Sequence, residues 1–271
     1  MSDPPDAPPP VEVVREGGAS PVVLLCEHAS NHVPPEYAGL GLGPRDLARH
    51  IAYDIGAAPL ARALSAALDA PLFLSGHSRL LLDLNRPPGS ATSIPLRSED
   101  TDIPGNLAVT PEERARREAW LFAPYAGAVA SHLDARARAG RPTVVVGVHS
   151  FTPVFLGVAR PWEAGFLYGR AGAFGRALVA ALRAADPSLT VGDNEPYKVG
   201  GETDYTVPVH GDARGLPAAL VEVRQDLLAD AAGVAAWAGR LAPLLARVGA
   251  DHAVAQGSVG GMSSRAAVTA V

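Results

Sequence analysis

The chain has little of what several protein classes depend on. It contains one cysteine, Cys26, so no disulfide can form within it. Apolar runs such as those at 142–148 and 217–223 are far shorter than the roughly 20 residues that cross a bilayer. The net charge is -5 and no segment gathers lysine and arginine, which argues against a nucleic-acid partner. We therefore expect neither a disulfide scaffold, nor a membrane protein, nor a nucleic-acid binder.

Further absences narrow the function. No GxxxxGK[ST], GxGxxG or GxSxG string occurs, which removes the usual signs of nucleotide binding and of a serine nucleophile. The opening MSDPPDAPPP lacks the basic region and the apolar stretch of a secretory signal, so we expect a cytoplasmic protein. Lysine is scarce beside abundant alanine, glycine, proline and arginine. This bias is typical of a high-GC genome, and we give it no mechanistic weight.

The chain does have enough apolar sequence for one large core. Its 271 residues are 48% hydrophobic and show no break in composition, which predicts a single domain. We place that domain at 20–252. Residues 1–20 are rich in proline and glycine, and residues 253–271 are small and weakly charged, so both ends are predicted to be flexible tails.

Short apolar runs alternate with stretches of helical period. Strands are predicted at 21–26, 71–75, 79–84, 142–148 and 218–223, and helices at 44–68, 111–139, 170–185 and 227–248. The helix at 111–139 has clear ends, because Thr110 can cap it, Pro111 suits its first turn, and Gly140 follows it. The alternation predicts an α/β fold with a mainly parallel sheet.

Four hydrophobic runs each end in a polar tetrad. The tetrads are EHAS at 27–30, DLNR at 83–86, VHSF at 148–151 and EVRQ at 222–225. Open α/β sheets bind ligands in the crevice beyond the carboxyl ends of their strands, so we expect these side chains to meet at one edge. Histidine and glutamate at strand ends are common ingredients of a metal-assisted hydrolase.

Two histidines and a carboxylate form a candidate Zn2+ site. His28 and His149 each leave a predicted buried strand, and Asp54 lies near the start of a predicted helix. Such a set is familiar in catalytic zinc sites and leaves one coordination position for water. His50 is an alternative ligand, because it precedes Asp54 by four residues and can share its helix face. Structural roles, such as capping a loop or a helix, are the competing interpretation of these side chains.

Glu222 and Arg86 are candidates for the base and for a substrate clamp. A glutamate in an apolar strand is costly unless it is paired or used, so Glu222 could act as general base or pair with Arg224. The Arg86 guanidinium could hold a substrate carboxylate through two parallel hydrogen bonds, or form a salt bridge with Asp83.

Two further polar residues and two long loops could complete the site. His210 and Arg79 could contact substrate or stabilise an oxyanion, or brace loops instead. The stretches 86–109 and 186–216 carry most of the turn residues, and loops of this length are usually functional or mobile. We therefore expect them to form walls of the active site.

Seven motifs resemble a known enzyme family. CEHASN, HIAYDIGA, SRLLLDLNRP, GVHSFTP, NEPY, DYTVPVHG and VEVRQD occur in this order over nearly all of 20–230, and together they resemble the N-formylglutamate amidohydrolase family. DLNR, GVHS and VEVRQD also resemble the aspartoacylase and succinylglutamate desuccinylase group. The resemblance implies a zinc-exopeptidase-like, single-domain, three-layer α/β/α fold with a mixed, mainly parallel sheet. It also implies an enzyme of amino-acid metabolism, with histidine degradation as the pathway.

The resemblance implies roles for individual residues. His149 would be a Zn2+ ligand, Glu222 the general base, and Asn85 and Arg86 the residues that hold the substrate. Arg79, Arg224 and His210 would assist in binding an anionic N-acyl amino acid, foremost N-formyl-L-glutamate, which is cleaved to L-glutamate and formate.

One departure from the related group concerns the second metal ligand. That group takes its first two ligands from a His-x-x-Glu pair, whereas Asn31 stands three residues after His28 here. The second ligand must therefore come from elsewhere, and we prefer Asp54 to Glu27 and His50.

Two other functions compete with this interpretation. One is a zinc hydrolase of the same architecture that acts on a different N-acyl amino acid or a small peptide-like amide. The other is a non-catalytic module that binds a small molecule.

Overall fold

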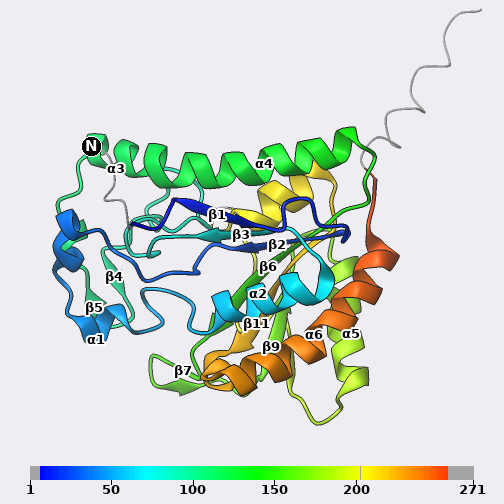
Figure 1. The fold of residues 1–271 in the computed structure, drawn as a ribbon. Coiled ribbons are helices and arrows are strands. Elements are labelled where there is room, and N and C mark those ends of the chain that lie inside the picture. Colours follow the sequence, from blue (N-terminus) through cyan, green and yellow to red (C-terminus); the bar gives the residue numbers. More distant parts are fainter. Residues whose placement is uncertain (1–6, 202, 256–271) are drawn as a thin grey trace, which may run out of the picture.

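A seven-stranded mixed sheet forms the centre of the fold. The computed structural model describes residues 7–201 and 203–255, and the strand order is β1-β3-β2-β6-β11-β9-β10 (Figure 1). The strands are β1 Val11–Val14, β2 Val22–Cys26, β3 Leu72–Ser75, β6 Val144–Phe151, β9 Ala164–Leu167, β10 Val191–Asp193 and β11 Ala218–Arg224. Strands β3, β2, β6 and β11 pair in parallel, as do β9 and β10, whereas β1 with β3 and β9 with β11 are antiparallel.

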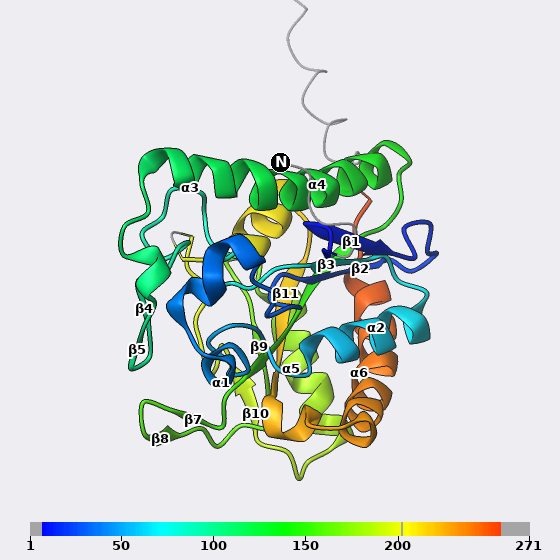
Figure 2. The ribbon, with the colours of Figure 1, turned by 60° about the vertical axis from the view of Figure 1, so that its left-hand side comes forward.

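Helices cover both faces of the sheet, which gives the expected three-layer α/β/α arrangement (Figures 1 and 2). One face carries α3 Pro111–Arg117 and α4 Ala123–Arg138, which a π-helical turn joins. The other face carries α2 Ala57–Leu68, α5 Ala173–Ala185 and α6 Ala231–His252. The smaller elements include α1 Pro44–Leu47 and two hairpins, β4 Arg97–Ser98 with β5 Thr101–Asp102 and β7 Val154–Phe155 with β8 Val158–Ala159.

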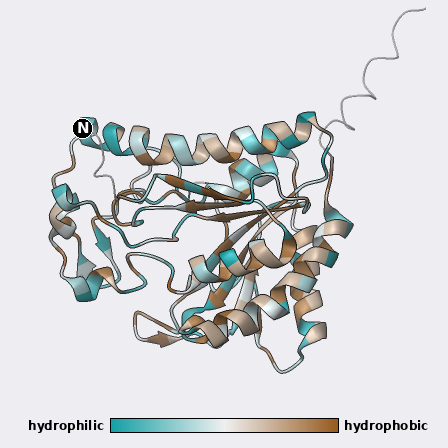
Figure 3. Cartoon of the chain, viewed as in Figure 1, coloured by the Kyte–Doolittle hydropathy of each residue, from teal (hydrophilic) through white to brown (hydrophobic). Residues whose placement is uncertain are grey.

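The central strands are apolar along most of their length, as expected for strands that are covered on both faces, and polar residues come near the carboxyl ends of β6 and β11 (Figure 3). In β2 all residues are fully buried. Val22, Leu24 and Cys26 pack into the core beneath α2, α5 and α6, while Val23 and Leu25 pack into the core beneath α4. This two-sided burial fixes the sheet and so the positions at which its strands end.

The helical segment predicted at 111–139 is confirmed, and its cap explains where it begins. The Thr110 side chain accepts a hydrogen bond from the backbone N–H of Glu113 at 3.2 Å, and Gly140 has a positive φ of 62° after the last turn. A glycine adopts this left-handed backbone without steric cost, so the helix ends there.

Two of the predicted elements are wrong. The helix predicted at 44–68 is divided into α1 and α2 by residues 48–56, because Gly56 has a φ of 81° and a helix cannot continue through it. The strand predicted at 79–84 is a series of turns, in which Ser78 accepts a backbone hydrogen bond from Leu81 at 3.0 Å. Its leucines are buried in the core beneath α4 without pairing to a strand.

Three strands of the central sheet, and the four short strands of the two hairpins, are absent from the prediction. Strand β1 falls within residues 1–20, which were expected to be a tail, and pairs with β3 along its whole length. Strands β9 and β10 are short and contain Gly165 and Gly192, so they carry a weak β signal. Residues 1–6 and 256–271, the outer parts of the two predicted tails, lie outside the described residues. Within the described chain, no helix is long and apolar enough to cross a membrane.

Candidate active site

A cavity of about 450 Å³ opens at the carboxyl ends of the parallel strands. His28 follows β2, His149 lies in β6, and Glu222 lies in β11; all three line the cavity. Residues from both loops that the sequence marked as walls also line it: Thr92, Pro95, Arg97, Ser98, Glu99, Tyr197, Lys198, Thr203 and Asp204. The parallel strands thus deliver polar side chains to one edge, as the tetrads predicted for β2, β6 and β11.

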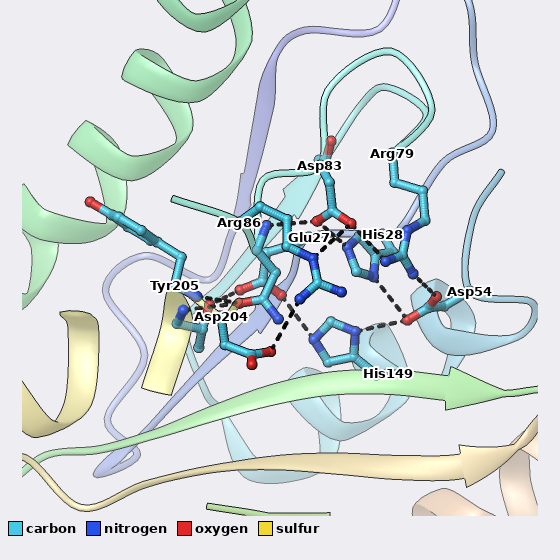
Figure 4. Close-up of polar contacts among 12 residues, drawn as sticks. Glu27, His28, Asp54, Arg79, Asp83, Arg86, His149, Asp204 and Tyr205 are labelled. Carbon is cyan, nitrogen blue, oxygen red and sulfur yellow. Dashed lines mark hydrogen bonds and ion pairs between the residues drawn. The ribbon is translucent and has the colours of Figure 1, made fainter. Parts of the chain in front are cut away.

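His28, Asp54 and His149 form a buried group that could bind a metal ion (Figure 4). One ligand atom from each lies within 4.8 Å of the others. Asp54 Oδ2 is 3.3 Å from His28 Nδ1 and 2.7 Å from His149 Nδ1. The segment between α1 and α2 carries Asp54, whose backbone N–H donates to the carbonyl of His28 at 2.9 Å. The break in the predicted helix is therefore what brings Asp54 to the histidines.

Each histidine of this group is held on its far side by another carboxylate. His28 Nε2 is 2.8 Å from Asp83 Oδ1, and His149 Nε2 is 3.2 Å from Glu27 Oε2. Metal-binding histidines usually have such a partner, which fixes the tautomer and the orientation of the ring. Both rings therefore keep Nδ1 for the metal position, and the donor set suits zinc.

The charges around this group favour a cation. Burial alone would raise the pKa of Asp54, but His28 and His149 bring it below its ordinary value. Burial likewise opposes protonation of His149, yet Asp54 and Glu27 raise its pKa well above the ordinary value. Three buried carboxylates, those of Glu27, Asp54 and Asp83, thus surround two imidazoles. A divalent cation bound to the neutral imidazoles would take the place of the protons that these carboxylates draw onto the histidines.

Glu222 lies beside the candidate metal-binding group. It is the register partner of His149 between the parallel strands β11 and β6. Its side chain is buried, and Oε2 has no hydrogen-bond partner among the described residues. Burial raises the pKa of Glu222 to about 7. A carboxylate with this pKa can both accept and return a proton near neutral pH.

Arg79 braces the carboxylates of the group (Figure 4). Its guanidinium lies 3.4 Å from Asp54 Oδ1 and 2.6 Å from Asp83 Oδ2. It therefore fixes the carboxylate of Asp54, a candidate ligand, and the carboxylate of Asp83, which contacts His28. The structure gives this arginine two partners within the chain, rather than leaving its guanidinium free for a substrate.

Asn85 and Arg86 line the cavity and also hold its wall. Asn85 Oδ1 accepts hydrogen bonds from the backbone N–H groups of Tyr205 at 3.1 Å and Thr206 at 2.9 Å. Arg86 donates to the carbonyl of Thr203, and its Nε lies 3.7 Å from Asp83. Both interpretations of Arg86, the clamp and the salt bridge, remain compatible with this position.

Three predicted residues lie outside the metal group. His210 packs edge-on against Tyr205 with ring centroids 5.3 Å apart, and burial lowers its pKa to about 4. Arg224 pairs with Asp226 at 2.8 Å, and neither it nor His210 is a lining residue. His50 lines the cavity, but its Nε2 lies 3.1 Å from Glu99 instead of joining the group.

The sequence analysis missed what orients the histidines and part of what lines the cavity. It considered Glu27 as a metal ligand and Asp83 as a partner for Arg86. In the structure, Asp83 contacts Nε2 of His28 and Glu27 contacts Nε2 of His149. Their positions beside His28 and within DLNR were the available signal. Tyr197 and Lys198 also line the cavity, at the end of the NEPY motif and directly after it.

Comparison with known proteins places this geometry in context. A model of the N-formylglutamate amidohydrolase family matches residues 20–229. Among solved structures, gene product Atu2144 from Agrobacterium tumefaciens is 38% identical with a TM-score of 0.86, over 90% of this chain and 96% of that chain. N-formylglutamate amidohydrolase from Ralstonia eutropha JMP134 shares the fold at 18% identity and a TM-score of 0.59, over 90% of this chain and 98% of that chain. No curated protein matches the chain.

Proposed function

The chain belongs to the N-formylglutamate amidohydrolase family and is a hydrolase that acts on amides, and we propose that it cleaves N-formyl-L-glutamate to L-glutamate and formate with Zn2+ as cofactor. The main observation behind this proposal is that Glu222 and His149 lie opposite each other on the neighbouring strands β11 and β6. A buried carboxylate whose pKa is about 7 lies beside a group that could bind a metal. Glu222 would then be a base next to the metal ion that polarises the substrate carbonyl.

The metal site of this proposal consists of His28, Asp54 and His149. Zinc bound there would polarise the acyl carbonyl and lower the pKa of water toward about 7. Asp83 and Glu27 hold the two imidazoles with Nδ1 turned to the site, and Arg79 fixes the carboxylate of Asp54.

Glu222 moves the protons of the reaction. Its carboxylate accepts a proton from the water that attacks the acyl carbon, and the carbon–oxygen bond forms. The carbon–nitrogen bond then breaks, and Glu222 returns the proton to the departing amine nitrogen. Burial raises the pKa of this carboxyl to about 7 in the metal-free chain, which favours a group that both accepts and returns a proton.

Arg86 and Asn85 hold the amino-acid part of the substrate in this proposal. Both line the cavity, and an arginine there can form charge-assisted hydrogen bonds with a carboxylate. Binding through this end of the substrate would position the amide bond over Glu222. Arg79 acts through the carboxylates that it braces, and His210 and Arg224, which lie outside the lining, take no part.

Formate release from N-formyl-L-glutamate tests the proposal, with the N-acetyl and N-succinyl analogues as comparisons. We expect the formyl compound to be cleaved with the highest kcat/KM. We also expect Glu222→Gln to lower kcat by about 10² to 10⁴ while the metal content stays unchanged. Preferred cleavage of an analogue would assign a different acyl group, and full activity of Glu222→Gln would contradict the role of the base.

A further inference from the structure

The chain contains 22 arginines but a single lysine, and that lysine lines the active-site cavity. Lys198 follows the NEPY motif, and its side chain is exposed. Every other position that carries a permanent cation is occupied by arginine. A lysine ammonium is a compact charge on a flexible stem, whereas arginine presents a rigid planar fork. The one lysine therefore offers the cavity a kind of cation that no arginine supplies.

The arginine side chains that line the cavity each have partners within the chain. Arg79 is paired with Asp54 and Asp83. Arg86 contacts Asp83, the Thr203 carbonyl and Asp204.

Arg97 is likewise paired, with Asp102 at 2.6 Å. Lys198, in contrast, makes no hydrogen bond or ion pair within residues 7–201 and 203–255. Of the arginines and lysine that line the cavity, Lys198 is the one that has no partner among the described residues.

The segment that presents Lys198 is anchored closely to the sheet. Asn194 donates its backbone N–H to Phe166 O at 3.0 Å, and its side chain accepts from Tyr168 N at 2.8 Å. A Cβ added at Gly165 would lie 1.9 Å from Glu195 O. The backbone just before Lys198 therefore rests directly on β9.

A second anchor fixes the residue next to the lysine. The Arg160 guanidinium lies over the rings of both Phe155 and Tyr197, each at 4.6 Å, and donates to the Tyr197 hydroxyl at 2.8 Å. Tyr197 is thus held against the β7–β8 hairpin. Lys198 thus directly follows a segment that contacts β9 and the hairpin, which limits the backbone rearrangement that ligand binding requires.

We infer that Lys198 binds a second substrate carboxylate, separate from the one held by Arg86, and so makes the enzyme selective for N-acyl derivatives of dicarboxylic amino acids. This inference rests on the proposed function, because it assigns a specificity residue to the same site. The two cations would divide the two carboxylates of the substrate between them. We assign the side-chain carboxylate to Lys198.

Paired substrates test the assignment by kinetics. N-formyl-L-glutamine has the shape of N-formyl-L-glutamate but lacks the side-chain charge. We expect Lys198→Gln to raise KM for the glutamate derivative by about 10- to 100-fold, with a smaller change in kcat and less than a threefold change for the glutamine derivative. Lys198→Arg should restore part of the selectivity. Equal losses on both substrates, or no loss on either, would overturn the inference.

A second experiment needs no turnover, because the lysine is unique. Reductive methylation with ¹³C-formaldehyde keeps the positive charge and labels only Lys198 and the terminal amine of this sequence. We expect L-glutamate to shift the Lys198 NMR signal saturably and L-glutamine to leave it in place. The matched control is Lys198→Arg combined with Arg247→Lys, which moves the single lysine to an exposed position on α6 outside the cavity lining. Its signal should not respond.

The two experiments separate the inference from the function on which it rests. A shift with L-glutamate in a protein that releases no formate would overturn the proposed substrate but support Lys198 as a carboxylate site. Formate release without any shift, or an equal shift with L-glutamine, would overturn the inference and leave the proposed function standing.

Discussion

Single residues decide what the cavity can hold. The side chains of His28 and His149 each contact a carboxylate at Nε2 and turn Nδ1 toward Asp54. An imidazole used only as a loop brace needs one such partner. Here both ring nitrogens of each histidine face carboxylates, and all of these groups are buried. The arrangement therefore favours a bound cation over a purely structural network.

The choice among the candidate metal ligands is tested by variants of His149, Asp54 and His50. We expect His149→Ala and Asp54→Asn to weaken zinc binding by at least about 10²-fold, because ligand loss should cost at least as much as loss of an outer partner. His50→Ala is the matched control, since His50 lines the cavity but pairs with Glu99. Equilibrium competition with a chromogenic chelator measures the affinities. Weakened binding in His50→Ala with normal binding in Asp54→Asn would reverse the assignment.

Glu222 makes the stability of the metal-free protein depend on pH. Its pKa is raised by burial to about 7 in the folded state. Between about pH 4.5 and 7 the unfolded chain therefore loses this proton first, and the free energy of unfolding falls as pH rises. We expect Glu222→Gln to abolish this component, which amounts to about 3 kcal/mol above pH 7.

Urea unfolding of the metal-free wild type and of Glu222→Gln, at several pH values from 4.5 to 8, measures this component as a difference. Titrating groups far from Glu222 contribute equally to both proteins and cancel, so the difference reports Glu222 together with the buried groups that interact with it, such as His149 and Asp54. Parallel pH profiles for the two proteins would show that Glu222 titrates normally.

At the scale of elements, the parallel pairing of β6 and β11 brings Glu222, the proposed base, beside His149, a proposed metal ligand. Glu222 and His149 are register partners, so their separation is set by backbone hydrogen bonds. Strand β9 pairs with β11 on its other side and supports the segment before Lys198. The short strand that the sequence did not reveal is thus part of the construction of the cavity wall.

Gly165 tests this support. A Cβ added there would lie 1.9 Å from Glu195 O, so the backbone must shift, and we expect Gly165→Ala to lower the free energy of unfolding by about 1–3 kcal/mol. Gly127→Ala in α4 is the control, because a Cβ there meets nothing within 4 Å and alanine should stabilise the helix by about 0.5–1 kcal/mol. Denaturant unfolding compares the two. Equal effects would show that the loop does not rest on β9 as described.

How far the elements could be predicted depended on length and on local signals. The long buried strands β2, β6 and β11 and the capped helix at 111–138 have clear patterns, so they were found. The run at 79–84 resembles a strand in sequence because it is apolar. In the structure its leucines lie on turns and are buried in the core beneath α4. An apolar run predicts that a segment is buried, but a strand also needs backbone hydrogen bonds to a neighbouring strand, which the run does not reveal.

The same limit applied to the site. Residues that leave predictable strands, His28, His149 and Glu222, could be placed at one edge from the sequence. The role of Asp83 could not, because it depends on how a turn folds back onto His28. Arg224 and His210 were assigned to substrate by motif, yet their side chains lie outside the cavity lining. Long-range contacts of loops decide these cases, and a linear pattern does not record them.

At the scale of the whole molecule, two covered sheet faces leave the carboxyl edge of the parallel strands free for the cavity. Segments far apart in the chain meet there: the end of β2, the segment before α2, the turns at 79–86 and the loop at 197–204. A metal ion bound by His28, Asp54 and His149 would link the end of β2, the segment before α2 and strand β6 in the folded state alone.

Metal removal should therefore lower global stability. A ligand that binds only the folded chain stabilises it by about 2.7 kcal/mol at 100 times its Kd. We expect chelation to lower the Tm, and restored zinc to raise it again, in the wild type but not in His149→Ala. Differential scanning calorimetry measures the change. An unchanged Tm after chelator is added to the zinc-loaded wild type would show that the metal does not connect these segments.

The most direct test of the account is elemental analysis of the purified protein, coupled to formate release from N-formyl-L-glutamate before chelation, after chelation and after zinc is restored. The account predicts about one zinc per chain, loss of formate release with the metal, and recovery with added zinc. Formate release that persists in protein shown to be free of metal would contradict it.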